Sequence, residues 1–195
     1  MSRMFPAVFV DRDGVLIEDV HLLTQTEQVS VMKDVPAALT RLRRAGLKLV
    51  LVTNQPVVAR GLALEKDIER IHGHLNDLLE QLGARKFDAI YFCPHHPNAT
   101  VPSYRLDCPC RKPKPGMILA AAKDHSLDLA RSFMVGDRVT DIVAGASAGC
   151  KTVLLTSGRH VVPPIETVEP LPTSIHPDHV CSSLFEATEW ILEAR

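Results

Sequence analysis

Two aspartates one residue apart, Asp11 and Asp13, follow a short apolar run and directly precede a glycine. Residues 8–10 are typical of a buried strand, and Gly14 favours a sharp turn, so both carboxylates are expected at the carboxyl end of that strand. Carboxylates held this close repel each other unless a cation lies between them or one is protonated. The pair predicts a catalytic cation site or, alternatively, the polar cap of a strand-to-helix turn.

Three later segments repeat this arrangement, in which an apolar strand-like run ends in polar residues. The runs are residues 47–52, 90–92 and 133–135, and the polar residues after them are Thr53, Asn54 and Gln55, then Cys93, then Asp137 and Arg138. Arg111 and Lys112 supply cations between the last two runs. Open α/β sheets bind ligands at the carboxyl ends of their strands, so we expect these side chains to form one site.

The order of acid pair, hydroxyl, lysine and further acid resembles that of the haloacid dehalogenase-type phosphatases. The motifs span residues 11–141, so a chance match is improbable although each motif is weak alone. The resemblance implies that Asp11 attacks phosphorus and forms an aspartyl-phosphate, and that Asp13 is the acid/base. It also implies that Mg²⁺ is held by Asp11, the backbone carbonyl of Asp13 and Asp137.

The same resemblance assigns Thr53 and Lys112 to stabilisation of the phosphoryl group. An N-cap role for Thr53 and Asn54 is expected alongside it. The alternative for Lys112 is a solvated surface charge, a description that suits Lys114 better. For Asp141 the choice is between support of the acid before it and a favourable charge at the start of its helix, and we favour the helix start.

Substrate contacts are implied by the same resemblance. They fall on Arg12, Asn54, Gln55, Arg111 and Arg138, and on the loop of Asp19, Val20, His21 and Leu22. An arginine fork suits a second phosphate or sugar hydroxyls. The alternative for the loop is an ordinary lid without specific contacts.

A second cluster of possible ligands consists of two close pairs, Cys93 with His95 and Cys108 with Cys110. Three thiolates and an imidazole form a closed tetrahedral set, so the spacing predicts a structural Zn²⁺ in a loop over residues 93–110 that activates no water. His96 competes as a ligand, and His95 is preferred because Cys-x-His mirrors Cys-x-Cys and because family members with this loop use the first histidine. The alternative is buried free cysteines with surface histidines.

The other two cysteines and the pair His72 and His74 do not indicate another metal site. Cys150 and Cys181 lie in apolar runs and are expected in the core, and His72 and His74 are too close in sequence to share a helix face. Folding of the loop around zinc would bring Arg111 and Lys112 over the phosphate pocket.

Within the family, such a zinc loop occurs in phosphatases of heptose 1,7-bisphosphate and of histidinol phosphate. The long interval before Cys108, the Pro-Gly-Met of residues 115–117 and the Ala-Arg-Gly of residues 59–61 resemble the heptose enzymes. Two departures from their pattern are Pro-Val-Val at residues 56–58 and Arg138 in place of lysine. The rival classes are a binding module without catalysis and a phosphomutase, which needs a cap domain to exclude water.

The elements that must position these residues are those of an α/β fold. Strand-like runs alternate with helical periodicity over residues 35–45, 64–82, 116–125 and 139–148, and further elements are expected at 151–156, from 180 and over 184–193. This alternation predicts a Rossmann-like, doubly wound parallel sheet. Insertions 16–31 and 56–64 are too short for a separate cap domain, and proline-rich residues 158–177 are expected to wrap the surface.

Composition is that of an ordinary globular domain. The chain has 195 residues, 46% of them apolar and 23% charged, with a formal net charge of −1. These values predict one domain over residues 1–195 with no nucleic-acid or membrane surface. The family resemblance implies a small sugar phosphate as the substrate, and we expect a monomer. An N-terminus without an apolar signal core and an odd number of cysteines favour a cytoplasmic, reducing location.

Overall fold

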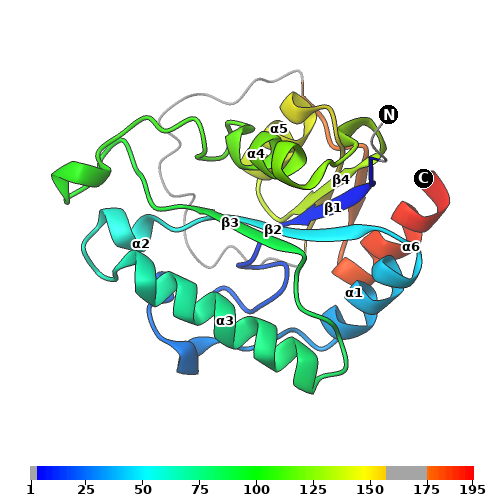
Figure 1. The fold of residues 1–195 in the computed structure, drawn as a ribbon, viewed down its shortest axis with the longest axis horizontal. Coiled ribbons are helices and arrows are strands. Elements are labelled where there is room, and N and C mark those ends of the chain that lie inside the picture. The colour runs from blue at the N-terminus through cyan, green and yellow to red at the C-terminus, as the bar shows by residue number, and fades with distance from the viewer. Residues whose placement is uncertain (1–3, 157–174) are drawn as a thin grey trace.

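The computed structural model describes residues 4–156 and 175–195 (Figure 1). It contains six strands, namely β1 (Ala7–Val10), β2 (Lys48–Asn54), β3 (Ala89–Cys93), β4 (Phe133–Gly136), β5 (Lys151–Leu155) and β6 (His179–Cys181). All neighbouring strands pair in parallel, in the order β3-β2-β1-β4-β5-β6. This is the strand order of the Rossmann fold, so the predicted fold class is confirmed.

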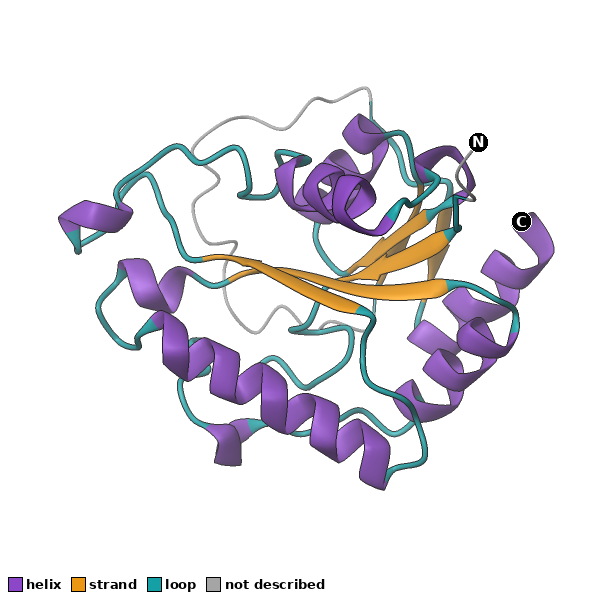
Figure 2. Cartoon of the chain, viewed as in Figure 1, coloured by secondary structure: helices purple, strands orange, loops and turns teal. Residues whose placement is uncertain are grey.

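Helices cover both faces of the sheet (Figure 2). On one face lie α1 (Val35–Arg44), α3 (Glu65–Gln81) and α6 (Leu184–Ala194), and on the other lie α4 (Gly116–His125) and α5 (Val139–Ala148). A short helix, α2 (Pro56–Ala59), directly follows β2. Helices on both faces are the expected consequence of parallel connections between neighbouring strands.

Each face of β1 contributes to a different apolar core. Val8 and Val10 pack in the core beneath α1, α3 and α6, whereas Ala7 and Phe9 pack in the core beneath α4 and α5. All four side chains are fully buried. Burial on both faces explains why this strand is a continuous apolar run and shows no alternation with polar residues.

The sheet reverses its direction of growth at β1, which pairs with β2 on one side and β4 on the other. The backbone N–H of Asp11 donates to the Val135 carbonyl oxygen at 3.0 Å. The residues that follow β1 and β4 therefore emerge side by side at the carboxyl edge. In open α/β sheets, this switch point is where ligands bind.

Most expected elements agree with the structure within one or two residues. β2 is longer than predicted because Thr53 and Asn54 still pair with β3. The insertion expected at residues 56–64 opens with α2, and that at 16–31 contains the 3-10 turn Thr26–Gln28. Cys150 is buried as expected, whereas Cys181 is only half-buried.

The proline-rich segment 158–177, apart from its last three residues, lies outside the described residues. Within the described ranges, no helix combines the length and the apolar character needed to cross a membrane.

Candidate active site

Three buried carboxylates meet at the switch point. Asp11 follows β1, Asp137 follows β4, Asp141 lies in the first turn of α5, and their ligand oxygens lie within 4.8 Å of one another. Two glycines make this approach possible. A Cβ on Gly14 would lie 2.3 Å from an Asp137 carboxylate oxygen, and one on Gly136 would lie 2.2 Å from the Asp141 Cβ.

Lys112 neutralises part of this charge from within the cluster. Its Nζ lies 2.9 Å from Asp11 Oδ1 and 2.6 Å from Asp141 Oδ1, and it donates to the Val52 carbonyl oxygen at 2.9 Å. Burial alone would lower the pKa of Lys112, but the two carboxylates outweigh it and raise that pKa above its usual value. With 3% of its surface exposed, Lys112 is a buried cation of the site, whereas Lys114 is partly exposed.

The Asp137 carboxylate is the group that lacks a partner. Neither of its buried oxygens accepts a hydrogen bond from any described residue. Burial, with the charges of Asp11 and Asp141, raises the pKa of Asp137 to about 8. Burial likewise raises the pKa of Asp141 to about 6, against the opposing charge of Lys112. Oxygen ligands with surplus negative charge and an unsatisfied carboxylate are suited to a hard divalent cation.

Asp141 has a larger role than the sequence predicted. Its Oδ2 accepts from the Arg138 backbone N–H at 3.0 Å, which is the expected contribution to the start of α5. Its Oδ1, however, contacts Lys112 in the centre of the site. The preference for the helix-start role was therefore incomplete, because one carboxylate oxygen serves the helix and the other serves the lysine.

The Asp13 carboxylate is held apart from the cluster by two neighbours. Arg12 donates to it from Nε at 3.1 Å and from Nη2 at 3.0 Å, and Gln55 Nε2 donates to its Oδ2 at 3.1 Å. Burial raises the pKa of Asp13, and the nearby charge of Asp11 adds to this effect, while Arg12 opposes both. Gln55 Nε2 also donates to Thr53 Oγ1 at 2.9 Å, so Asp13 and Thr53 share one amide donor.

Asn54 binds the backbone of Lys112 at two points. Its Nδ2 donates to the Lys112 carbonyl oxygen at 3.0 Å, and its Oδ1 accepts from the Lys112 N–H at 3.1 Å. The amide therefore fixes the segment that carries the lysine. The expected N-cap role of Thr53 and Asn54 is wrong, because β2 continues through both residues and Gln55 occupies the cap position of α2 without a side-chain cap bond.

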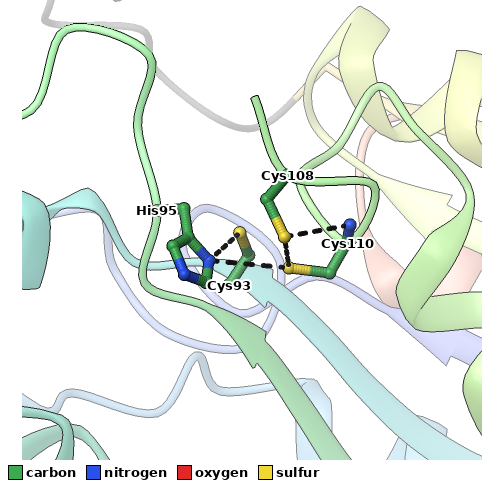
Figure 3. A group of neighbouring side chains, drawn as sticks. All are labelled: Cys93, His95, Cys108 and Cys110. Atoms are coloured by element: carbon green, nitrogen blue, oxygen red, sulfur yellow. Dashed lines mark hydrogen bonds between the residues drawn. The ribbon is translucent and has the colours of Figure 1, made fainter. Parts of the chain in front are cut away.

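The four predicted loop ligands come together beyond the end of β3 (Figure 3). His95 Nδ1 lies 3.8 Å from Cys93 Sγ and 4.0 Å from Cys110 Sγ, and the Cys108 and Cys110 sulfurs are 2.7 Å apart. His96 is not in the cluster, and its Nδ1 accepts from a backbone N–H two residues further along the chain. Three thiols and one imidazole within 4.8 Å suit a tetrahedral zinc ion.

The cysteine loop is joined directly to the carboxylate cluster. Gly116 at the start of α4 donates to the Pro109 carbonyl oxygen at 3.0 Å, and a Cβ on Gly116 would lie 2.2 Å from that oxygen. Arg111 Nη1 donates to the His95 carbonyl oxygen at 3.1 Å. The last ligand, Cys110, is thus followed by an arginine anchored on the loop and by the lysine of the cluster.

The predicted substrate loop is tied to Arg138, the residue after Asp137. Asp19 Oδ2 accepts from Arg138 Nη2 at 3.1 Å, and Asp19 Oδ1 accepts from the His21 backbone N–H at 3.0 Å. His21 and Leu22 adopt left-handed φ values of 46° and 57° and complete the turn. Val20 is exposed and has no described link to the other predicted site residues.

Comparisons with known proteins agree with this geometry. Residues 109–187 match the model of the HAD-hydrolase-like family. The chain is 42% identical over 144 residues to the D-glycero-beta-D-manno-heptose-1,7-bisphosphate 7-phosphatase of Rhodopseudomonas palustris, an alignment that covers 74% of this chain and 79% of the relative. The chain belongs to the haloacid dehalogenase-like phosphatases.

Two further comparisons cover nearly the whole of this haloacid dehalogenase-like phosphatase. The enzyme of the same name from Helicobacter pylori is 39% identical over 186 residues, which are 95% of this chain and 96% of the relative. The solved D,D-heptose 1,7-bisphosphate phosphatase from B. bronchiseptica, complexed with magnesium and phosphate, is 32% identical with a TM-score of 0.78 and covers 97% of this chain and 99% of its own.

Two residues near the site were not predicted from the sequence. His72 lies within hydrogen-bonding distance of Arg12, and its signal was a polar residue on the apolar face of α3, between Ile71 and Leu75. Arg60 acts on Arg111 through its charge. Burial lowers the pKa of Arg111, the Cys93 and Cys110 thiols oppose this effect, and the cations Arg60 and Arg138 add to it.

Proposed function

We propose that this phosphatase removes the 7-phosphate of D-glycero-β-D-manno-heptose 1,7-bisphosphate and that Asp11 is its nucleophile. The observation that carries the reaction is the buried Asp11 carboxylate, 2.9 Å from the Lys112 ammonium at the switch point of the sheet. The substrate is suggested by the curated relatives, which carry this activity in their names.

In the first step, an Asp11 carboxylate oxygen attacks the 7-phosphorus as the bond from phosphorus to the sugar oxygen breaks. Lys112 and the Thr53 hydroxyl face the phosphoryl oxygens and offset the negative charge that develops on them. Asn54 keeps Lys112 in place by holding its backbone at two points. The product of this step is an aspartyl-phosphate and a free sugar hydroxyl.

Asp13 supplies the proton that the departing sugar oxygen needs. Because burial raises its pKa, Asp13 is better suited to carry a proton than an exposed aspartate would be. In the second step, Asp13 takes a proton from the water that attacks the phosphoryl group. Inorganic phosphate leaves, and Asp11 returns as a free carboxylate.

Two cations complete the proposal. Asp11, the Asp13 backbone carbonyl and Asp137 would hold Mg²⁺, which neutralises the carboxylates and the phosphoryl oxygens together. Cys93, His95, Cys108 and Cys110 would hold a structural Zn²⁺. The loop then keeps Arg111 beside Lys112, where the guanidinium can bind the remainder of the sugar phosphate.

The charges around the site favour a bisphosphate as the substrate. The charges of Arg60 and Arg138 both lower the pKa of Arg111, against the opposing effect of the Cys93 and Cys110 thiols. A second phosphate would be attracted by these guanidinium groups, which can bind it bidentately. The 7-phosphate is on a primary carbon and can reach the buried Asp11, whereas the 1-phosphate is hindered by the sugar ring.

The test is a comparison of kcat/KM for heptose 1,7-bisphosphate and for histidinol phosphate, with ³¹P NMR of the heptose product. We expect a preference of at least about a hundredfold, equivalent to about 2.7 kcal/mol, for the bisphosphate. The remaining phosphorus signal should belong to the 1-phosphate. A preference for histidinol phosphate, or retention of the 7-phosphate, would contradict the proposed substrate.

A further inference from the structure

Arg12 is an unusual buried cation with three polar partners. Its side chain is 1% exposed, and it is bound to Asp13 by two hydrogen bonds. Nη2 also donates to Gln55 Oε1 at 2.9 Å, and Nη1 lies 3.3 Å from His72 Nε2. Each of the three guanidinium nitrogens therefore has a partner within the protein.

The contact with His72 defines the state of that imidazole. Arginine has only donors, so His72 Nε2 must accept, and the ring must be neutral with its proton on Nδ1. Burial, reinforced by the charge of Arg12, lowers the pKa of His72 to about 3. The ring is 3% exposed and packs edge-on against Phe92, with centroids 5.6 Å apart. The imidazole is thus a fixed, neutral acceptor at physiological pH.

The orientation of Gln55 depends on that of Arg12. The guanidinium can only donate, so the amide must turn its oxygen toward Arg12 and its nitrogen toward the site. That nitrogen donates to Asp13 Oδ2 and to Thr53 Oγ1. The position of Arg12 thus determines two contacts of Asp13 directly and a third through Gln55.

We propose that His72 is a positioning residue for the acid/base step. It fixes the orientation of the Arg12 guanidinium, and Arg12 and Gln55 in turn orient the Asp13 carboxylate. Loss of the acceptor would leave one buried guanidinium arm unsatisfied, and Arg12 would turn away from Asp13 to regain a partner. The inference rests on the proposed role of Asp13. Nothing in it requires His72 to touch the substrate.

A purely structural histidine and a positioning histidine predict different kinetics. If His72 only fills space beside Phe92, its replacement lowers the amount of folded enzyme and affects all substrates equally. If it positions Asp13, replacement slows the first step only for substrates whose leaving group must be protonated, and kcat/KM reports that step because release of the leaving group is irreversible. Alkyl phosphates need that proton, whereas p-nitrophenyl phosphate has a leaving group that departs without it.

The test compares His72→Met, which removes the strong acceptor, with His72→Gln, whose Oε1 replaces Nε2. We expect His72→Met to lower kcat/KM for heptose 1,7-bisphosphate by about thirtyfold and to leave kcat/KM for p-nitrophenyl phosphate within about twofold. His72→Gln should restore the first value to within about threefold of wild type. His74→Met on the same helix is the matched control and should change neither substrate.

Equal losses on both substrates, or no loss on the bisphosphate, would overturn the inference. If His72→Met does not fold, His72→Asn takes its place, because its shorter amide is polar but does not reach Arg12. If the proposed substrate is wrong, the wild-type enzyme will itself show a higher kcat/KM for histidinol phosphate than for heptose 1,7-bisphosphate. In that case the same ratio is measured with histidinol phosphate as the alkyl phosphate, so the two proposals fail separately.

Discussion

The carboxylate cluster and the cysteine loop both gather possible metal ligands, but they are assembled in different ways. Asp11, Asp137 and Asp141 come from two strand ends and a helix start, and Lys112 already offsets part of their charge. The loop ligands come from one segment, residues 93–110, whose described structure after β3 includes only the short 3-10 turn Pro102–Tyr104. The sheet therefore holds the first site in place, whereas the second needs an ion to hold its loop.

At both sites, a possible ligand favours its protonated form when no cation is bound. Burial raises the pKa of Asp137 to about 8. In the loop, the neighbouring Cys93 thiol and burial raise the pKa of Cys110. A cation reverses both effects by favouring the charged ligand, so binding at either site releases protons. Loss of the ion has a different consequence at each site, because the carboxylate cluster loses its chemistry and the loop loses its structure.

The largest expected effect is on the chemical step. Asp11→Asn should reduce turnover of every phosphate ester by more than about a thousandfold, because an amide cannot form the phosphoenzyme. The melting temperature should change by no more than about 3 °C, since Lys112 keeps its contact with Asp141. Steady-state kinetics and thermal unfolding test both statements. Activity within about tenfold of wild type would remove Asp11 from the role of nucleophile.

A smaller, indirect loss is expected from the loop. Cys108→Ser should release the zinc and lower kcat/KM by about ten- to a hundredfold, because Arg111 and Lys112 follow the loop directly. Elemental analysis and kinetics on the same preparation provide the measurement. Cys150→Ser is the matched control, because this buried thiol lies outside the cluster and its loss should leave the zinc content unchanged. A zinc-free Cys108→Ser enzyme with wild-type kinetics would show that the zinc loop does not affect the active site.

Substrate binding should depend on the arginine that joins the two sites. Arg111→Ala should raise KM for heptose 1,7-bisphosphate by about tenfold and leave hydrolysis of p-nitrophenyl phosphate within about twofold. Arg111→Lys keeps the charge without the bidentate fork and should recover only part of the loss. Equal effects on both substrates, at unchanged zinc content, would show that Arg111 does not recognise the sugar phosphate.

The smallest effect concerns the pH dependence of stability. His72 has a folded-state pKa of about 3 and a reference value of 6.5, so the unfolded chain binds its proton first as pH falls. The free energy of unfolding should therefore decrease below pH 6.5, by up to about 1.4 kcal/mol per pH unit from this group. Urea unfolding between about pH 7 and about pH 5 should show a steeper decline for wild type than for His72→Gln. Parallel declines would contradict the assignment of a neutral, buried imidazole.

Much of the site could be predicted because its signals are local. The two ligand pairs, Cys93 with His95 and Cys108 with Cys110, have a spacing that is visible within one loop, and apolar runs that end in polar residues indicate the edge of the sheet. Spacing does not reveal which side chains pair across that edge. Asp141 divides its oxygens between the start of α5 and Lys112, and His72 reaches Arg12 from α3. Both contacts, Asp141 with Lys112 and His72 with Arg12, depend on tertiary packing between elements that are distant in the sequence.

The separate roles of the two sites are tested most directly by removing one metal at a time. Dialysis against Mg²⁺-free buffer should remove the weakly held Mg²⁺ and abolish turnover, while about one zinc per chain and the unfolding temperature are retained. Addition of Mg²⁺ alone should then restore full activity. Activity that is lost in step with zinc, and that returns only when zinc is added, would contradict the account by placing the chemistry in the cysteine loop.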